Sequence, residues 1–388
     1  MKVIGIVAEW NPFHLGHAAL VQEIRLKQEA AIIVSVMSGS FCQRGEAAIF
    51  DKWIRAEMAL ANGVDVVIEL PQYAATASLE QFATVGVEAL CAFHSLDALY
   101  CGSETGEAAA ITEQASYLKN NKRIYEAFIN EALANGTSYT QASQDFLYQG
   151  GFNTNNRSTP NDRLALQYRL ALPDTIPLHC FKRTVAHDNL HSHNKTASAS
   201  MIRQALYKNN STYEQFLPIA TCQRMPSKVS LPQHEDLLWP LKVYAASHSP
   251  QSLADSFGIH DGWENRFHAS ICEATSYEAL LTLAQTKHYS RSRIRRLILS
   301  ILSPIHAASS EIPYLRILGA SQRGRCLLKG ASHKAPLILN VAKALPLLSE
   351  NGKQHLQDDI HRQNLFDLLC HQPITNRDFL EKPRIQSH

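Results

Sequence analysis

Two histidines three residues apart carry the clearest chemical signal in this sequence. The pattern His14-Leu15-Gly16-His17 directly follows an apolar run and precedes a helical pattern. A helix N-terminus presents unpaired N–H groups and the positive end of its dipole, so it binds anions. The glycine lets the backbone approach a phosphate, and two imidazoles on one helical face can donate to the same phosphate. The pattern therefore predicts phosphoryl-type chemistry by positioning and charge stabilisation.

Taken alone, this short pattern is ambiguous. One imidazole could simply cap the helix, and a metal site is conceivable, although no third ligand is evident nearby. The strand before it and the helix after it favour phosphate binding. A second candidate anion site is the segment Ser198–Arg203, where Ser200 would be an N-cap or near-cap residue of a helix and Arg203 would lie on its first turn. An ordinary capped helix with a solvated arginine accounts for that segment equally well.

Short apolar runs alternating with helical patterns would position these groups. The runs are Val3–Ala8, Ala31–Met37, Val64–Leu70 and Leu96–Cys101, and Ile176–Phe181 is a candidate fifth strand. Continuously apolar strands that alternate with helices are typical of a parallel sheet covered on both faces. Such sheets bind ligands at the carboxyl ends of their strands. The predicted class is therefore α/β, with a Rossmann-like parallel sheet.

The pattern changes from about residue 210, where only helical periodicity remains. Ser227–Glu235 is polar, contains proline and is a candidate linker. We therefore expect a sheet domain over residues 1–215 and a mostly α-helical domain over residues 230–388, in keeping with a length of 388 residues.

Charge is balanced over the whole chain but concentrated locally. Lys plus Arg number 37 and Asp plus Glu number 35, a net charge of +2 that by itself argues against a polyanionic partner. Between residues 287 and 329, however, nine basic residues (287, 291, 293, 295, 296, 316, 323, 325 and 329) accompany one acidic residue, Glu311. This imbalance predicts salt-dependent nucleic-acid binding. The candidate contacts are Arg291, Arg293, Arg295 and Arg296; a charged helix face packed on the sheet domain is the alternative.

Composition excludes several classes of protein. A hydrophobic content of 45% and a charged content of 19% exclude general disorder. No apolar run is long enough for a membrane span, and no signal peptide is evident, so we expect no membrane partner. Eight cysteines without a Cys-x-x-Cys pair predict reduced thiols in a cytoplasmic protein. His187, His191 and His193 suggest a metal site, but no carboxylate or cysteine pattern completes it, which favours a solvated loop.

Several segments together resemble one family, the bacterial tRNA(Met) cytidine acetate ligases of the His-x-Gly-His nucleotidyltransferase superfamily. The opening Val7–His17 is similar almost residue for residue, and the resemblance runs to about residue 330. The sequence departs mildly from the pattern of this family in Thr196–Arg203 and Ala165–Tyr168. The other matching segments are Met37–Glu46, Asp51–Ala56, Asn62–Asp65, Ile68–Pro71, Gly102–Glu104, Pro160–Asp162, Glu264–Arg266, Arg293–Arg296 and Pro313–Gly319.

The resemblance implies a HUP-type nucleotidyltransferase domain that binds ATP, followed by a basic helical domain that binds tRNA. Acetate would attack ATP to give acetyl-adenylate and PPi, and N4 of the wobble cytidine of elongator tRNA(Met) would then take the acetyl group, giving N4-acetylcytidine and AMP. Mg²⁺ is expected with ATP, although the sequence does not name its ligands. The alternative function is a small-molecule adenylyltransferase of the same superfamily, which has no need of the basic helical domain. A non-catalytic RNA-binding protein is a third possibility.

Motif by motif, the resemblance places the chemistry on His14 and His17. Asn161 could equally be a helix cap beside Pro160. Lys52, Arg44 and Arg55 are further candidates for phosphate contacts, with a solvated face as the alternative. The predicted ATP site comprises Val7, Ala8, Glu9, Trp10, Asn11, Pro12, Phe13, His14, Leu15, Gly16, His17, Ala18, Ala19, Leu20, Gly102, Asn161, Arg183, Ser198, Ser200 and Arg203.

Overall fold

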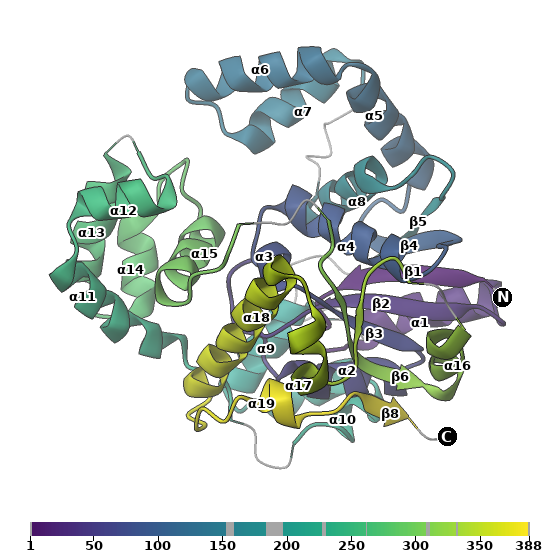
Figure 1. Ribbon diagram of the computed structural model, residues 1–388. Helices are drawn as coiled ribbons and strands as arrows, with labels where there is room; N and C mark the ends of the chain where they lie inside the picture. The colour runs from purple at the N-terminus through teal and green to yellow at the C-terminus, as the bar shows by residue number, and fades with distance from the viewer. Residues whose placement is uncertain are drawn as a thin grey trace.

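A single mostly parallel sheet lies at the centre of the molecule (Figure 1). The computed structural model describes residues 2–152, 159–183, 197–226, 230–260, 262–307, 311–330 and 333–386. The three histidines considered as metal ligands, and Thr196, lie outside these residues. Within them the sheet has the order β5-β4-β1-β2-β3-β6-β7, and β8 pairs with β6.

Five strands match the apolar runs of the sequence, and they confirm the predicted α/β class. Each pairs in parallel with its neighbour, in the order that places β1 between β2 and β4. Strand order therefore reverses between β1 and β4, because the chain runs from β1 through β2 to β3 and then returns to the other side of β1. The five strands are β1 (Val3–Ala8), β2 (Ile32–Ser38), β3 (Val66–Leu70), β4 (Ala98–Ser103) and β5 (Leu178–Lys182).

Alternate residues of the strands face two separate apolar cores. In β1, Val3 and Val7 pack into one core, whereas Ile4 and Ile6 pack into the other. The first core holds α4 (Leu79–Phe93) and α8 (Pro160–Ala171), with α3 (Gln72–Ala75) and α5 (Ala108–Asn120) on the same side. The second holds α1 (Leu15–Lys27), α2 (Lys52–Ala61) and α9 (Ala199–Tyr207). Both faces of the sheet are thus covered, which explains why its strands are apolar throughout.

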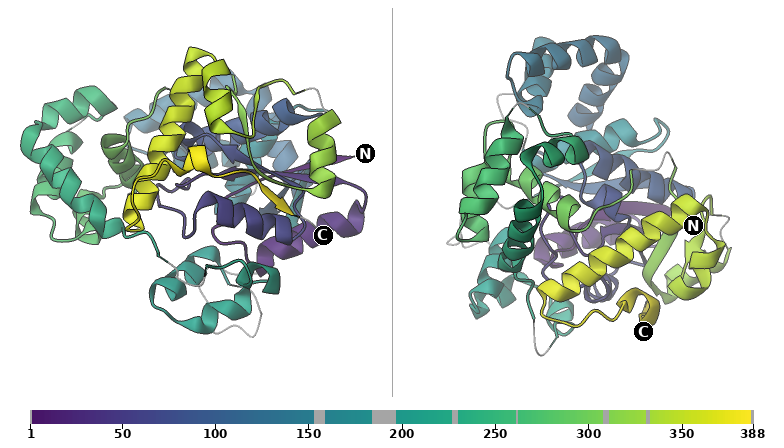
Figure 2. Two further views of the ribbon diagram at one scale, coloured as in Figure 1. Left: turned by 60° about the horizontal axis from the view of Figure 1, so that its bottom comes forward. Right: turned by 60° about the vertical axis from the view of Figure 1, so that its left-hand side comes forward.

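Two helical projections leave the sheet. One is the hairpin of α6 (Lys122–Ala134) and α7 (Tyr139–Gln149), which extends from α5 (Figure 1). The other, called here the helical lobe, stands apart from the sheet in Figures 1 and 2. It consists of α11 (Leu238–Ser247), α12 (Pro250–Phe257), α13 (Trp263–Glu273), α14 (Tyr277–Ala284) and α15 (Arg291–Leu302).

After the helical lobe the chain returns to the sheet at β6 (Leu315–Ser321), a strand that the helical periodicity after residue 210 did not predict. This strand lies antiparallel to β3, and β7 (Leu337–Ile338) and β8 (Arg384–Gln386) pair in parallel with it. The sequence hides β6 because Arg316 interrupts its apolar run. That arginine is buried against Glu69 and Asp378, so its charge is paired rather than solvated.

The remaining elements fill in around this frame. α18 lies in front of the sheet in Figure 1, and no described helix is long and apolar enough to cross a membrane. These elements are η1 (Ser211–Phe216), α10 (Ile219–Cys222), η2 (His234–Leu237), α16 (Gln322–Gly330), α17 (Val341–Ala344), η3 (Leu345–Leu347), α18 (Glu350–Leu369) and α19 (Arg377–Leu380).

Candidate functional site

A cavity of about 310 Å³ opens at the carboxyl ends of β1 and β4. These two strands flank the point where strand order reverses, which is where open α/β sheets bind their ligands. Most of the predicted ATP site lines this cavity. The predicted residues that do so are Val7, Ala8, Glu9, Trp10, Asn11, His14, Gly16, His17, Ala19, Leu20, Gly102, Asn161, Arg183, Ser198, Ser200 and Arg203.

Four predicted residues belong to the same segment but do not line the cavity: Pro12, Phe13, Leu15 and Ala18. Phe13 is fully buried in the apolar core beneath α1. The chain passes the cavity here as a turn followed by a helix, so only part of its side chains can face inward.

His14 and His17 are fixed by the start of α1. His14 is the N-cap, and its Nδ1 accepts from the backbone N–H of Gly16 at 3.0 Å and of His17 at 3.4 Å. His17 Nδ1 in turn accepts from the backbone N–H of His14 at 3.3 Å. The two rings stack with centroids 3.6 Å apart. Because both Nδ1 atoms are acceptors, the proton of each neutral ring is assigned to Nε2.

Both imidazoles are uncharged. Burial, reinforced by the nearby cations Arg183 and Arg203, lowers the pKa of His14 to about 3. Burial likewise lowers the pKa of His17 well below its usual range, with further contributions from His14 and Arg183. Neither ring therefore brings a positive charge to the cavity that it lines.

The turn before α1 is held in an unusual conformation. Trp10 has φ +44°, a left-handed value that is rare for a bulky residue and is concentrated at functional sites. Its indole N–H donates to Ser35 Oγ at 2.9 Å. The Asn11 amide donates to Cys42 Sγ at 3.3 Å, and its oxygen accepts from the backbone N–H of Ile49 at 2.7 Å. Buried hydrogen bonds thus fix the path of the chain between β1 and the two histidines.

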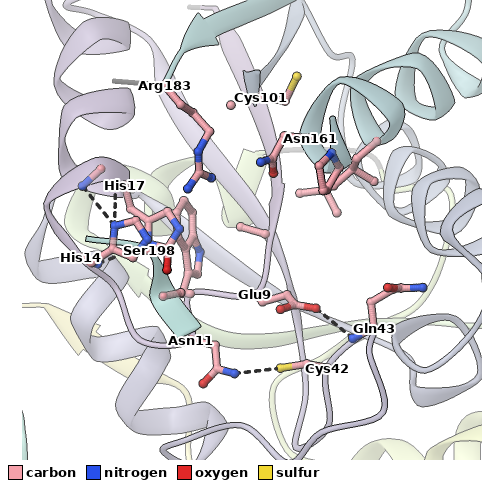
Figure 3. A pocket seen from close by; sticks show the side chains of 18 of the residues that line it. Glu9, Asn11, His14, His17, Cys42, Gln43, Cys101, Asn161, Arg183 and Ser198 are labelled. Carbon is pink, nitrogen blue, oxygen red and sulfur yellow. Dashed lines mark hydrogen bonds between the residues drawn. The ribbon is translucent and has the colours of Figure 1, made fainter. Parts of the chain in front are cut away.

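Arg183 and Asn161 line the cavity from either side of Cys101 in β4 (Figure 3). Arg183 follows β5, its backbone N–H donates to Ser103 O at 2.8 Å, and burial lowers the pKa of its guanidinium. Asn161 lies in the first turn of α8, where its amide donates to Glu104 Oε1 at 2.6 Å. That bond orients the Asn161 side chain and leaves its oxygen available as an acceptor.

The late Ser/Arg segment forms the predicted second helix N-terminus at the cavity. Ser198 caps α9 by accepting from the backbone N–H of Met201 at 3.3 Å, and its hydroxyl lies 3.0 Å from that of Ser200. Arg203 donates to Asn11 O at 3.0 Å and pairs with Glu46 at 3.3 Å. The starts of α1 and α9 therefore face one cavity, which doubles the anion-binding character of the site.

The loop after β2 forms a wall of the cavity that the sequence patterns did not predict. Cys42, Gln43, Arg44 and Glu46 line it, but of these only Arg44 was a candidate. The sequence could have predicted this wall, because the loop follows β2, the parallel neighbour of β1, and so leaves the sheet at the same edge. Tyr168 was also missed, although it lies two turns after Asn161 on the same face of α8.

Two of the candidate phosphate contacts prove to be structural. Lys52 and Arg55 have no exposed surface, so the prediction that they could meet a solvated phosphate is wrong. Lys52 Nζ lies 2.8 Å from Glu69 and 2.7 Å from Asp378. Arg55 donates to backbone carbonyls at the ends of β1 and β2.

The arginines of α15 divide into two groups. Arg295 pairs with Glu46 at 2.7 Å, and Arg296 donates to Gln43 O at 3.3 Å, so both contact the loop that lines the cavity. Arg293 is exposed, and its guanidinium lies 4.0 Å from the centre of the Tyr289 ring. Arg291 is partly exposed and pairs with Glu278 at 2.5 Å.

The basic stretch of the sequence does not form one surface. Arg316 is buried in β6, and the cations at 323, 325 and 329 lie on α16, at the opposite side of the sheet from the helical lobe in Figure 1. The α15 portion, by contrast, lies near the cavity. The count of charges along the chain therefore overstates the size of any single basic patch.

Comparisons with known proteins agree with this geometry over the whole chain. A family profile described as HIGH Nucleotidyl Transferase matches residues 1–381. A tRNA(Met) cytidine acetate ligase of Listeria monocytogenes is 34% identical and covers 95% of each chain. One from Leuconostoc citreum is 33% identical, over 99% of this chain and 97% of its own. The crystal structure of apo Thermotoga maritima TmcAL superposes with a TM-score of 0.90 at 27% identity, over 99% of both chains. The form of that protein bound with alpha-thio ATP gives 0.87.

Proposed function

The chain belongs to the HIGH nucleotidyl transferase family and, within it, to the tRNA(Met) cytidine acetate ligases, and on that premise we propose that it uses ATP and acetate to acetylate N4 of the wobble cytidine of elongator tRNA(Met). The observation that carries this function is the cavity itself. Two neutral histidines, two helix N-termini and three arginines (Arg44, Arg183 and Arg203) converge on it. Such a site binds a polyphosphate and needs no protein nucleophile.

ATP occupies the cavity in this proposal. Asn161 and the backbone at Gly102 receive the base or ribose beside β4, while the phosphates lie between the N-terminus of α1 and that of α9. His14 and His17 donate from Nε2 to the phosphate oxygens, and Arg183 neutralises their charge. Both imidazoles donate without carrying a charge, which suits a group that must stabilise developing charge in the transition state.

Acetate then reacts at the α-phosphorus. A carboxylate oxygen forms the new P–O bond, the bond to the β-phosphate bridge breaks, and PPi leaves with its electron pair. The product is acetyl-adenylate, a mixed anhydride that activates the acetyl carbon. The protein contributes alignment of the reactants and hydrogen-bond donors rather than a covalent step.

The tRNA contacts α15 in this proposal. Arg293 is exposed, and it is pre-ordered by stacking on Tyr289, which itself stacks on Trp263 at 3.8 Å between ring centres. Stacked arginines suit unpaired bases and phosphates. Arg291 lies on the same helix. We propose that Arg295 and Arg296 act mainly through the cavity loop that they contact.

Mg²⁺ enters with ATP. Among the described residues no group of three or more His, Cys, Asp and Glu side chains could hold a metal ion. The polar side chains that line the cavity are mostly hydrogen-bond donors, which fits an ion carried on the phosphate oxygens with several waters of its own. Because its substrate would be a tRNA, we place the enzyme in the cytoplasm.

The test is an incubation with ATP and labelled acetate, with and without a tRNA(Met) transcript. Label on cytidine together with AMP release supports the ligase. Transfer of AMP to a mononucleotide without acetate would instead support a small-molecule adenylyltransferase. Binding of tRNA with no turnover of ATP would make the protein a non-catalytic RNA binder.

A further inference from the structure

We propose that Glu9 accepts the proton that the cytidine N4 amine loses when it attacks acetyl-adenylate. This role rests on the proposed function and adds a catalytic residue to it. Glu9 is the first residue after β1, at the edge of the sheet where the cavity opens. It lines the same cavity as His14 and His17, and in Figure 3 its carboxylate points toward Gln43.

The Glu9 carboxylate is held in place by one of its oxygens. Oε1 accepts from the backbone N–H of Gln43 at 2.8 Å, a bond drawn in Figure 3. The main chain is fixed as well, because Arg55 donates to Glu9 O at 2.6 Å. Among the described residues Oε2 makes no hydrogen bond, and the carboxylate has no ion pair with a cation. One oxygen is therefore anchored and the other can accept a proton.

The other acidic side chain that lines the described part of the cavity is already neutralised. Glu46 pairs with Arg203 at 3.3 Å and with Arg295 at 2.7 Å. The two arginines occupy both oxygens of this carboxylate, so neither is open to a substrate N–H. Glu9 lacks such partners among the residues that the structure describes.

The remaining titratable groups of the cavity cannot act as bases. The Nδ1 lone pairs of His14 and His17 are used by backbone N–H groups, and their Nε2 atoms carry protons. Burial raises the pKa of the Cys42 thiol well above its usual range, and Glu9 itself adds to that rise. Tyr168, whose pKa burial also raises, donates to Val7 O at 3.3 Å. Cys101 likewise has a raised pKa, chiefly through its contact with Cys180.

The chemistry of cytidine requires such an acceptor. The N4 lone pair is delocalised into the ring, so N4 is a weak nucleophile that gains strength as its proton leaves. N4 forms the new bond to the acetyl carbon, and the bond from that carbon to the AMP oxygen breaks with its electrons on AMP. The N4 proton passes to Glu9 Oε2 and then to water. Acetyl-adenylate formation involves no N–H, so it does not need this group.

The variant Glu9→Gln separates the two half-reactions. Glutamine has the same shape, and its Oε1 can still accept from Gln43 N–H, but it takes up no proton. Glu23→Gln removes the same charge from α1 and serves as the control, because Glu23 pairs with Lys27 and does not line the cavity. The first half-reaction is followed by acetate-dependent exchange of PPi into ATP, and by trapping acetyl-adenylate with hydroxylamine as acetohydroxamate. The second is followed by single-turnover transfer of labelled acetyl to a tRNA(Met) transcript.

We expect Glu9→Gln to form acetohydroxamate within about twofold of the wild-type rate and to lose about 100-fold or more in transfer to tRNA, the range for a general base. Trapping by hydroxylamine also shows that the variant is folded. If exchange and transfer fall together, Glu9 serves ATP or its Mg²⁺ and the proposal is overturned. If the rates of PPi exchange and of acetyl transfer by Glu9→Gln both equal those of Glu23→Gln, Glu9 has no role in proton transfer. Absence of acetate-dependent exchange in the wild type would overturn the proposed function, and this role with it.

Discussion

His14 has two separable duties, and a pair of substitutions can divide them. Its Nδ1 caps α1 by accepting from Gly16 and His17, and we propose that its Nε2–H donates to the phosphates in the cavity that it lines. Alanine removes both functions. Asparagine is a preferred N-cap residue and should keep the capping function, but its short side chain cannot reproduce the Nε2–H donor. We therefore expect His14→Ala and His14→Asn to differ in stability and to agree in activity.

The magnitudes follow from these contacts. Loss of the cap in His14→Ala should lower the free energy of unfolding by about 1 kcal/mol, whereas His14→Asn should lie within a few tenths of a kcal/mol of the wild type. Loss of one preorganised donor to a developing oxyanion should slow acetyl-adenylate formation by roughly 100- to 1000-fold in both variants. Affinity for tRNA should persist, because His14 lies in the cavity and not on α15.

Urea unfolding measures the first difference, and acetate-dependent PPi exchange into ATP measures the second. Wild-type exchange by His14→Asn would refute the catalytic duty, because the Nε2–H would then have no part in the reaction. Wild-type stability of His14→Ala would refute the structural duty, because the observed cap would then contribute nothing.

Three further predictions concern the stability of the fold. Between pH 7 and pH 5 the wild type should lose about 2 kcal/mol of stability through His14 alone: its pKa falls to about 3 on folding, so only the unfolded chain gains a proton in this range. Urea midpoints at both pH values should show a smaller loss for His14→Asn, and equal losses would contradict the assignment. Gly45→Ala should cost about 2–4 kcal/mol, since φ is +75° and a Cβ would lie 2.7 Å from the backbone of α15. Gly136→Ala, with φ +76° and nothing within 4 Å, should cost only about 1 kcal/mol; equal midpoints for the two would show that the clash has no effect. Asp378→Asn should cost about 3–5 kcal/mol by leaving two buried cations short of a partner, whereas the exposed Asp174→Asn should unfold near the wild-type midpoint. A wild-type midpoint for Asp378→Asn would show that the buried cluster is not needed.

The sequence predicts those parts of the fold and site that depend on local pattern. The first five strands are apolar throughout because helices cover both faces, and such runs are visible in a single sequence. β6 is not, because Arg316 is compensated by carboxylates that lie far away in the sequence. The same limit applies to Arg295 and Arg296. Their charge is evident from the sequence, but only the fold shows that they meet the Gln43–Glu46 loop instead of solvent.

The loop Cys42–Glu46 makes the cavity and the helical lobe parts of one packed unit. Its neighbours Phe41 and Ala48 are buried in the core of the helical lobe, although they follow β2 in the sequence. Moving the lobe away would expose Phe41, at a cost of about 2–3 kcal/mol, and would break the contacts of Glu46 with Arg295. Glu46 also pairs with Arg203 in the middle of α9. A chain of contacts thus runs from α15, where we propose that tRNA binds, to the helix whose N-terminus we propose receives the phosphates. A displacement of α15 by RNA that breaks the Glu46–Arg295 pair would also reach Arg203, because Glu46 is common to both ion pairs.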